Sequence, residues 1–407
     1  MRQIPRGIWV LLCANVVIAL GFGLIAPALP SFARSFDVGY TAVSAVVSAF
    51  AVMRLLFAPA GGRLVTLLGE RRIYLSGLLI VAASTFACAF AGNYIQLLIF
   101  RGLGGIGSTM FSISAMALLI RLSPNDIRGR VAGFFSAGFL VGNIAGPLVG
   151  GALINYGLRM PFVVYAIALL IATVVVATQL REGAAQPLTG PAAAGVMSLR
   201  AALGDSAYRA ILASNFTQGW ASMGIRVAVV PLFITEGLGE SAPMAGVVLA
   251  VYAVGNVAAI VLAGRLSDRY GRRPVMLPGL AIMAASTAAL GYSPNLVVAL
   301  ILSLTAGVGS GLFAPTHQAA LADVLGASRQ GGSALAAYGM SSDLGAVTGP
   351  IVGGFVADRI GFGPAFLFTG VVAALAFGLW LRARETAPEV LAPRLAADEP
   401  GEPDRTA

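Results

Sequence analysis

Long apolar runs separated by short polar segments dominate the sequence. A helix needs about twenty apolar residues to cross the ~30 Å hydrocarbon core of a bilayer, and two sets of six such runs occur. The first set covers residues 8–29, 41–60, 73–91, 95–120, 131–152 and 161–180, and the second covers 210–234, 244–263, 275–291, 295–321, 332–357 and 364–381. The pattern predicts an all-α membrane protein with twelve transmembrane helices in two six-helix halves.

The polar segments divide the chain further. We expect an N-terminal six-helix bundle over 1–180, a cytoplasmic linker over 181–209, a C-terminal six-helix bundle over 210–381 and a disordered cytoplasmic tail over 382–407. The linker is rich in Ala, Gly and Pro, and its end, 198–209, is predicted to form a short amphipathic helix on the membrane surface. The tail is acidic and contains proline, a composition typical of disorder.

Composition and charge agree with a membrane location. The 407 residues are 58% hydrophobic and only 11% charged, whereas soluble domains carry charge at about a quarter of their positions. All 26 basic residues are arginine, which, with the abundant alanine and glycine, indicates a GC-rich bacterial genome. The net charge of +9 does not indicate nucleic-acid binding, because the arginines are scattered among short loops.

The distribution of arginine predicts orientation. With both termini inside, the cytoplasmic segments hold 20 arginines, the outer loops hold three and the spans hold three. Basic loops stay in the cytoplasm, so we expect a multi-pass protein of the bacterial inner membrane with both termini cytoplasmic.

An internal repeat relates the two halves. The segment 146–151 recurs at 349–354 and Pro161 recurs as Pro364, both with an offset of 203 residues. The loop 264–274, with the sequence Gly-Arg-Leu-Ser-Asp-Arg-Tyr-Gly-Arg-Arg-Pro, has a diverged copy at 62–72, offset by 202. Duplicated six-span halves are typical of secondary transporters, which hold substrate near the membrane midplane between the halves.

Glycines recur every four residues in the fifth span, where they form one row on a helix face. Pro147 within the row removes a backbone hydrogen bond and favours a bend. The row either packs a neighbouring helix closely or also forms a seam that moves during transport. The residues of this motif are Gly142, Gly146, Pro147, Gly150 and Gly151.

These motifs resemble the major facilitator superfamily over the chain to about residue 381. The loop pattern Gly-x-Leu-x-Asp-Arg-x-Gly-Arg-Arg is matched in full at 264–273, and Arg101 with Gly105 and Gly107 is similar to the fourth-span motif of twelve-span drug:proton antiporters. The resemblance implies a secondary active transporter for proton-coupled efflux of small hydrophobic compounds by alternating access. It also implies a gating role for the loop residues Gly264, Asp268, Arg269, Gly271, Arg272 and Arg273.

The sequence departs from this family in two places. The first-half loop has Thr66 at the aspartate position and Glu70 where arginine is usual, and the first span offers Asn15 where the antiporters carry a carboxylate. For Asp268 we expect a contact with the positively polarised start of the fifth span near Arg130. No such contact is expected in the first half.

Ionisable residues inside spans carry an unfavourable free energy of burial in the bilayer, and so they mark candidate functional sites. Asp343 lies about 16 Å into the eleventh span, and is either a proton carrier or half of a fixed ion pair with Arg54. His317 is either a proton relay or a hydrogen-bonded structural group. The proton-coupling candidates are Asp343, Arg101, His317 and Arg54, and the candidates for lining a substrate cavity are Asn15, Phe22, Asn143, Gln218, Trp220, Arg226, Tyr252 and Tyr338.

Two other functions stay open. Three arginines against one aspartate within the spans favour an anionic metabolite or acidic lipid as the substrate, and the diverged first-half loop is compatible with a sensor that binds without transporting. No nucleophile–histidine–acid set, metal-ligand cluster or nucleotide-binding motif occurs, so an enzyme, a metal site and a cofactor are not expected. The expected partners are a small-molecule substrate, protons and the lipid bilayer, with the protein a monomer.

Overall fold

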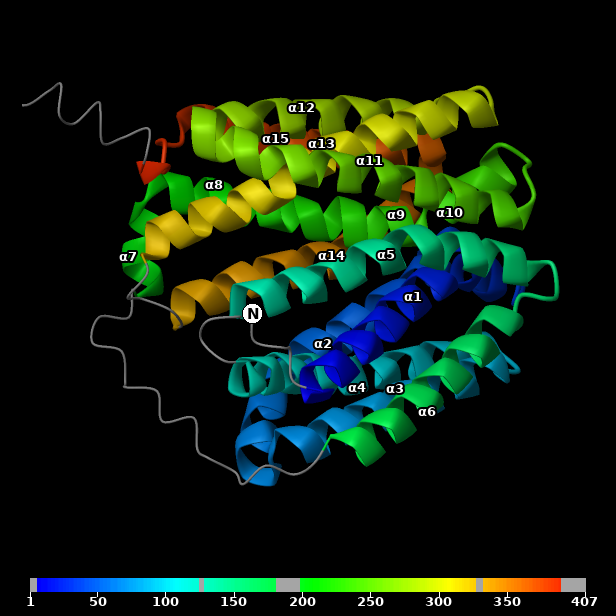
Figure 1. Cartoon of the computed structure of the whole chain (residues 1–407). Coiled ribbons are helices and arrows are strands. Elements are labelled where there is room, and N and C mark those ends of the chain that lie inside the picture. The colour runs from blue at the N-terminus through cyan, green and yellow to red at the C-terminus, as the bar shows by residue number, and fades with distance from the viewer. Residues whose placement is uncertain (1–5, 124–127, 181–197, 327–331, 389–407) are drawn as a thin grey trace, which may run out of the picture.

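A computed structural model describes residues 6–123, 128–180, 198–326 and 332–388, and this part of the chain folds into helices joined by short turns (Figure 1). The predicted tail beyond residue 388 and most of the linker lie outside the described residues. In chain order the long helices are α1 (Arg6–Arg34), α2 (Tyr40–Leu68), α3 (Glu70–Ala89), α4 (Tyr94–Leu122), α5 (Arg128–Ile154), α6 (Met160–Gln179), α11 (Ala242–Tyr270), α12 (Arg272–Leu290), α13 (Leu296–Leu325), α14 (Ser333–Ile360) and α15 (Phe362–Arg382).

Ten of these helices, all except α14, are long and apolar enough to cross a membrane. Apolar side chains on their outer faces remain exposed, as in Ile99, Val261 and Leu375, which are 54%, 60% and 66% exposed. Exposed apolar surface of this extent is suited to lipid contact. Helix α14 contains serines, glycines and three charged residues that lower its hydropathy.

The predicted span over 210–234 is not one regular helix. It consists of α8 (Ser206–Gln218), a π-helical segment η1 (Gly219–Ile225), the single turns α9 (Arg226–Ala228) and α10 (Val230–Leu232), and a second π-helical segment η2 (Phe233–Gly237). Pro231 lacks the N–H that a regular helix needs. A Cβ on Gly219 would meet the carbonyl oxygen of Ser342, so α14 approaches this segment closely.

The surface helix predicted over 198–209 is also divided. Helix α7 (Leu199–Gly204) ends at Asp205, whose carboxylate accepts a hydrogen bond from the Ala207 N–H at 2.9 Å and so caps α8. Ser198 caps α7 in the same way, accepting from the Ala201 N–H at 3.3 Å. Two helix-capping side chains seven residues apart therefore split one predicted helix into two.

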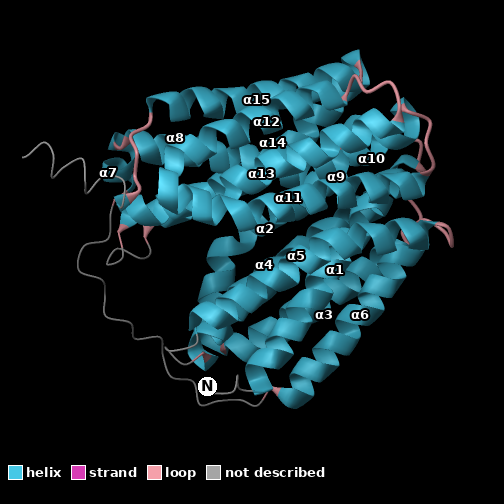
Figure 2. Ribbon diagram, turned by 45° about the horizontal axis from the view of Figure 1, so that its top comes forward, coloured by secondary structure: helices cyan, strands magenta, loops and turns pink. Residues whose placement is uncertain are grey.

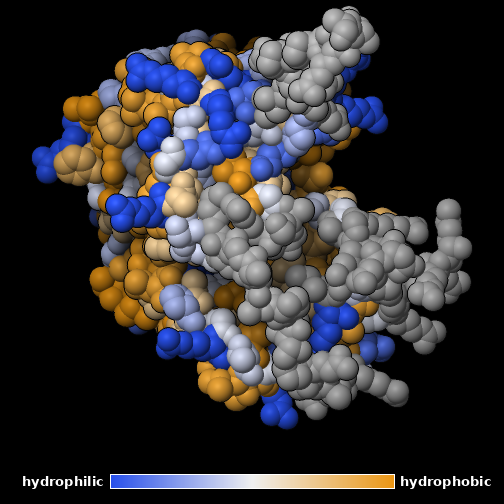
Figure 3. Space-filling view, turned by 90° about the vertical axis from the view of Figure 1, so that its left-hand side faces the viewer, coloured by the Kyte–Doolittle hydropathy of each residue, from blue (hydrophilic) through white to orange (hydrophobic). Residues whose placement is uncertain are grey.

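Helices α1 to α6 pack mainly on one another, and the elements from α8 to α15 do the same (Figures 1 and 2). Contacts between these two groups run chiefly through α2 with α14 and α5 with α11. We call the end of the molecule where α1 begins and α15 ends the terminal face, and the opposite end, where α1 gives way to α2, the distal face. Hydrophilic side chains gather on the terminal face, with apolar surface at its margins (Figure 3).

Hydrogen bonds between the two groups of helices cluster toward the distal face in the described part of the chain. Asp358, near the end of α14, accepts from the backbone N–H groups of Tyr40 and Thr41, both at 2.7 Å, and from the Thr41 hydroxyl. Glu236 in η2 accepts from Arg34 Nε at 3.0 Å and from the Tyr40 hydroxyl at 2.9 Å. Two carboxylates of one group thus bind the α1–α2 corner of the other.

Candidate functional site

Three cavities lie among the helices. The N-cavity is lined from α1, α2, α3, α4, α5 and α6 by residues that include Phe22, Phe50, Arg54, Arg101, Ser108, Phe111 and Tyr165. The C-cavity is lined by residues that include Ala221, Ile225, Arg226, Val248, Leu249, Tyr252, Thr287, Leu290, Ser303 and Phe366. The interface cavity lies between the two groups of helices and is lined by Phe22, Gly23, Ala26, Asn143, Pro147, Arg226, Val227 and Leu249.

Two of the proton-coupling candidates, Arg54 and Arg101, meet in the N-cavity. The Arg54 guanidinium donates to the Ser108 hydroxyl at 3.3 Å. The guanidinium carbon of Arg101 lies 4.3 Å from the centre of the Phe50 ring, and its Nε has no hydrogen-bond partner among the described residues. A buried cation over an aromatic face is stabilised by the ring quadrupole, which compensates Arg101 only in part for lost hydration.

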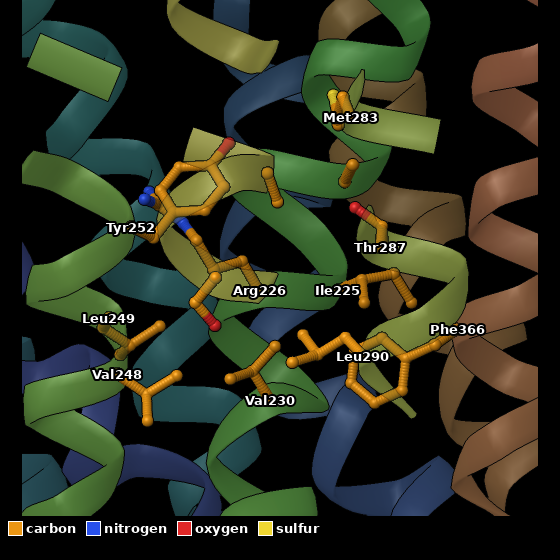
Figure 4. A pocket seen from close by; sticks show the side chains of 13 residues that line it. Ile225, Arg226, Val230, Val248, Leu249, Tyr252, Met283, Thr287, Leu290 and Phe366 are labelled. Atoms are coloured by element: carbon orange, nitrogen blue, oxygen red, sulfur yellow. The ribbon is translucent and has the colours of Figure 1, made fainter. Parts of the chain in front are cut away.

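Arg226 lines both the C-cavity and the interface cavity. Its Nε donates to the Ser222 carbonyl at 3.1 Å, one turn earlier in η1. Its guanidinium carbon lies 4.3 Å from the centre of the Tyr252 ring, and the two side chains lie against each other at one side of the C-cavity (Figure 4). The structure therefore brings together Arg226 and Tyr252, two of the predicted cavity residues.

Asp343 and His317 do not line any of the three cavities. No salt bridge within 4.0 Å joins Arg54 and Asp343 in the described chain, so the direct ion pair is not formed in this structure. His317 is buried between the rings of Phe313 and Tyr338, each with its centre 5.8 Å away. Its Nδ1 has no hydrogen-bond partner among the described residues.

Four predicted cavity residues have packing roles instead. Asn15 is buried and donates to the Phe135 carbonyl at 2.9 Å, which joins α1 to α5. Trp220 is buried and donates from its indole N–H to the Thr369 hydroxyl at 3.2 Å. Gln218 accepts from Ser310 at 3.2 Å, and the Tyr338 ring lies against the His317 ring with centres 5.8 Å apart. Buried polar groups of this kind need partners, and a sequence alone does not show whether a partner is a ligand or another helix. Phe22 and Asn143 do line cavities.

The glycine row of the fifth span packs on α1. A Cβ on Gly142, Gly146 or Gly150 would lie 2.2–2.7 Å from atoms of α1, so each of these positions requires glycine. Gly151 faces away from this row, toward Pro243 and Gly246 at the start of α11. The row is therefore a seam between neighbouring helices of one group, whereas Gly151 and the Pro147 carbonyl contact α11 of the other group.

The loop between α11 and α12 forms an ion network at the terminal face. Arg272 donates from Nε to Asp323 at 2.9 Å and from its terminal nitrogen to Asp268 and to the Ser267 hydroxyl. Glu385, beyond α15, accepts from the backbone N–H groups of Arg272 and Arg273 at 2.8 and 3.0 Å.

Other residues of this loop lie at the margins of the network. Arg273 donates to the Leu381 carbonyl, and Arg269 lies over the Tyr270 ring. Gly264 has open space around it, and Gly271 ends α11 with a φ of 101° that only glycine adopts easily. The carboxylate of Asp268 thus binds within its own group of helices, and the expected contact with the start of α5 falls on side chains outside the described part.

The first-half copy of this network has its charges exchanged. An offset of 202 residues relates Glu70 to Arg272 and Arg121 to Asp323. Glu70 and Arg121 form a salt bridge of 3.1 Å, at the places where Arg272 and Asp323 form theirs. The first loop is therefore inverted in polarity rather than degraded. Comparing both members of each pair at the repeat offset would have revealed the exchange in the sequence.

Glu385, Glu236 and Asp358 were not anticipated, because each binds a segment that is remote in sequence. No group of three or more His, Cys, Asp or Glu side chains suited to a metal ion occurs among the residues described.

Comparisons with known proteins agree with this architecture. The sequence matches the family model described as Major Facilitator Superfamily over residues 11–225 and 211–401. It is 28% identical over 375 residues to Multidrug resistance protein 1 of Bacillus subtilis, covering 91% of this chain and 94% of that protein. It is 31% identical over 157 residues, 39% of this chain and 40% of the relative, to Quinolone resistance protein NorA of Staphylococcus aureus.

The fold is similar to that of a bacterial homolog of the human lysosomal transporter Spinster, solved in an inward-facing and unoccupied conformation. The TM-score is 0.76 at 17% identity, over 95% of this chain and 97% of that one. The family match extends over most of the chain. Members of this family are transporters and not enzymes. This multi-pass membrane protein is a transporter that belongs to the Major Facilitator Superfamily.

Proposed function

We propose that the protein is a secondary active exporter of small, mostly hydrophobic compounds, driven by proton antiport. It has twelve spans in two six-helix halves, residues 1–180 and 210–381, and both termini in the cytoplasm. The stretch from α8 to η2 supplies the seventh span, and α14 supplies the eleventh. The names of the relatives as multidrug and quinolone resistance proteins support export, and the arginine distribution supports the orientation.

The observation that carries the proposal is the location of the contacts between the halves. They cluster at the distal face, where Asp358 and Glu236 bind the α1–α2 corner. A transporter that is closed on the outside and open to the cytoplasm has this distribution, and alternating access reverses it.

In the opposite conformation, Asp268 is free to leave Arg272 and bind the start of α5, as the family resemblance implies. Only the second half can do so, since the first half has Thr66 at this position. Asp268→Asn is therefore expected to impair transport more than any change at Thr66. Equal effects at both sites would mean that loop 264–274 only fixes the orientation of the protein in the membrane and has no gating role.

Asp343 is the carboxylate proposed to carry the coupled proton. It lies in the middle of α14, and Arg54 would stabilise its charged form in a conformation that brings the two side chains together. In proteoliposomes, an imposed pH gradient should drive wild-type export, and Asp343→Asn should abolish this dependence while leaving downhill counterflow. Glu240→Gln, in the distal turn, serves as the matched control and should transport normally.

Two results would contradict this function. Wild-type transport that ignores an imposed pH gradient would exclude proton coupling. Failure of the wild-type protein to exchange a bound ligand across the bilayer would exclude transport and favour a sensor. An unchanged pH dependence in Asp343→Asn would move the coupling role to His317, which is buried without a partner for its Nδ1 among the described residues.

A further inference from the structure

We propose that Arg226 binds the acidic group of an amphipathic organic anion, a carboxylate, sulfonate or phosphate on an apolar body, as the ligand of this protein. The inference rests on the proposed function and specifies the charge of its substrate. It is carried by the position of Arg226, by its lack of a counter-charge and by the walls of the cavities that it lines.

The local backbone places Arg226 between two cavities. It is the first residue after the π-helical segment η1, and π-helical turns shift the following side chains around the helix axis and often occur at functional sites. From this position the side chain lines both the C-cavity and the interface cavity. It remains partly accessible although its neighbours Ile225 and Val227 are buried.

The contacts of Arg226 hold it in place but leave its charge uncompensated. The guanidinium donates from Nε to the Ser222 carbonyl and lies over Tyr252. The Tyr252 hydroxyl shares a hydrogen bond of 2.8 Å with the Ser222 hydroxyl, which fixes the ring. No carboxylate lies within salt-bridge distance of Arg226 in the described chain. A cation removed from water without a counter-charge is costly, and an anionic ligand would offset this cost.

The charges of the cavity walls point to the same ligand. Three arginines line the three cavities, Arg54, Arg101 and Arg226, and no Asp or Glu does so among the described residues. A cationic ligand would face like charge with no carboxylate to neutralise it, whereas an anion meets a donor that binds carboxylates with two parallel hydrogen bonds.

The remaining walls of the C-cavity suit an apolar body. Leu249, Val248, Leu290 and Phe366 surround the space next to Arg226 (Figure 4). Thr287 and Ser303 are among the few polar side chains on these walls. An apolar cavity with one fixed charge orients an amphipathic ligand with its acidic group at the charge.

The test is equilibrium binding to the full-length protein in phosphatidylcholine nanodiscs, with two probes that share one apolar body. Pyrenebutyrate carries a carboxylate, and a pyrenebutyl trimethylammonium salt carries the opposite charge. We expect the wild-type protein to bind the anion more tightly than the cation. Arg226→Gln should weaken anion binding about ten-fold or more, from the loss of a charged hydrogen-bond donor, and Arg226→Lys should retain most of it.

Arg359→Gln is the matched control. Arg359 also lies near an aromatic ring, that of Phe355, but at the end of α14 away from the cavities, so the variant should bind like the wild type. Tyr252→Phe should keep the stacked guanidinium and most of the affinity. If Arg226→Gln does not fold, Arg226→Lys and Tyr252→Phe still test the site. A preference for the cation, binding of neither probe, or equal anion affinity in wild type and Arg226→Gln would overturn the inference.

Transport assays separate this inference from the proposed function. Anion binding without counterflow would refute export and leave the ligand assignment intact. Export of the cation without anion binding would refute the assignment and leave export intact. The anion has two possible sources, and short-chain phosphatidylglycerol tests them. Displacement of bound pyrenebutyrate by this lipid assigns an acidic lipid as the natural ligand, and retention of the probe assigns a soluble organic acid.

Discussion

At the scale of single residues, the exchanged ion pairs explain why the first-half loop has Thr66 where the second-half loop has Asp268. Arg272 forms salt bridges with two carboxylates, those of Asp268 and Asp323. With glutamate at the equivalent position 70, an aspartate at position 66 would place two negative charges across the α2–α3 turn, where Asp268 and Arg272 meet in the second half, and like charges repel. Thr66 avoids this repulsion, and its hydroxyl donates to the Gly62 carbonyl at 3.1 Å.

A double-mutant cycle should measure the first pair. Glu70→Gln and Arg121→Gln are each expected to cost about 1–3 kcal/mol of unfolding free energy, because each leaves a charged group without its partner. The double variant should cost less than the sum of the two. Thermal unfolding in detergent measures all three, with Arg209→Gln as a control outside the pair. Strictly additive losses would mean that the salt bridge contributes nothing.

At the scale of secondary-structure elements, the two halves begin their third and ninth spans differently. Helix α3 starts with Glu70 itself, an acid suited to the positive end of a helix dipole. Helix α12 starts with two arginines, which that dipole disfavours, and Glu385 supplies the missing negative charge from beyond α15. The segment after α15 therefore acts as an N-terminal cap for α12.

This cap should make stability depend on pH. Burial raises the pKa of Glu385, but hydrogen bonds from the N–H groups of Ala387, Arg272, Arg273 and Thr386 outweigh it, so that the pKa lies below its ordinary value of 4.5. The contribution of Glu385 is therefore complete above 4.5 and is lost as pH falls through the lowered pKa. Melting temperatures recorded from neutral pH to below 4 should fall less steeply for Glu385→Gln than for wild type. Parallel curves would remove Glu385 as the cause.

The sequence predicts most elements well and some contacts poorly, for identifiable reasons. Spans such as α1 and α13 follow from long apolar runs that only a helix can place in a bilayer. The division of the seventh span into α- and π-helical segments does not follow from the sequence, because both kinds of turn have the same apolar content. It is associated with the close approach of α14 to Gly219, through Ser342, which is 123 residues away. The roles of Asn15 and Trp220 depend on partners that are equally remote.

At the scale of the whole molecule, the two carboxylates at the distal face act differently: Glu236 pairs with the opposite charge of Arg34, whereas Asp358 meets backbone. Asp358 accepts from the first N–H groups of α2, which have no partner within their own helix. This contact joins the two groups of helices and at the same time completes a helix end. Its rupture therefore leaves these two N–H donors without a protein partner in the open state.

Removing the charge of Asp358 should shift the molecule toward the conformation that is open at the distal face. Asp358→Ala is expected to weaken closure by about 1 kcal/mol, several-fold in population, as for other helix caps. Spin labels at Tyr156 and Tyr292, exposed in turns of the two groups at the distal face, should show more long distances by pulsed electron resonance. Asp37→Asn, an exposed acid in the same region, should leave the distances unchanged. An unaltered distribution in Asp358→Ala would contradict the role of the cap.

The exchanged ion pairs also limit how the two repeats can be recombined. A chimera that copies loop 264–274 into positions 62–72 would set an arginine at position 70 against Arg121, turning an attraction into a repulsion. The copied loop should function only if Arg121 becomes aspartate as well. The unit that can be moved between the halves is therefore the loop together with Asp323, which lies 51 positions after Arg272, near the end of α13. Transfer of the loop alone carries only one member of the ion pair.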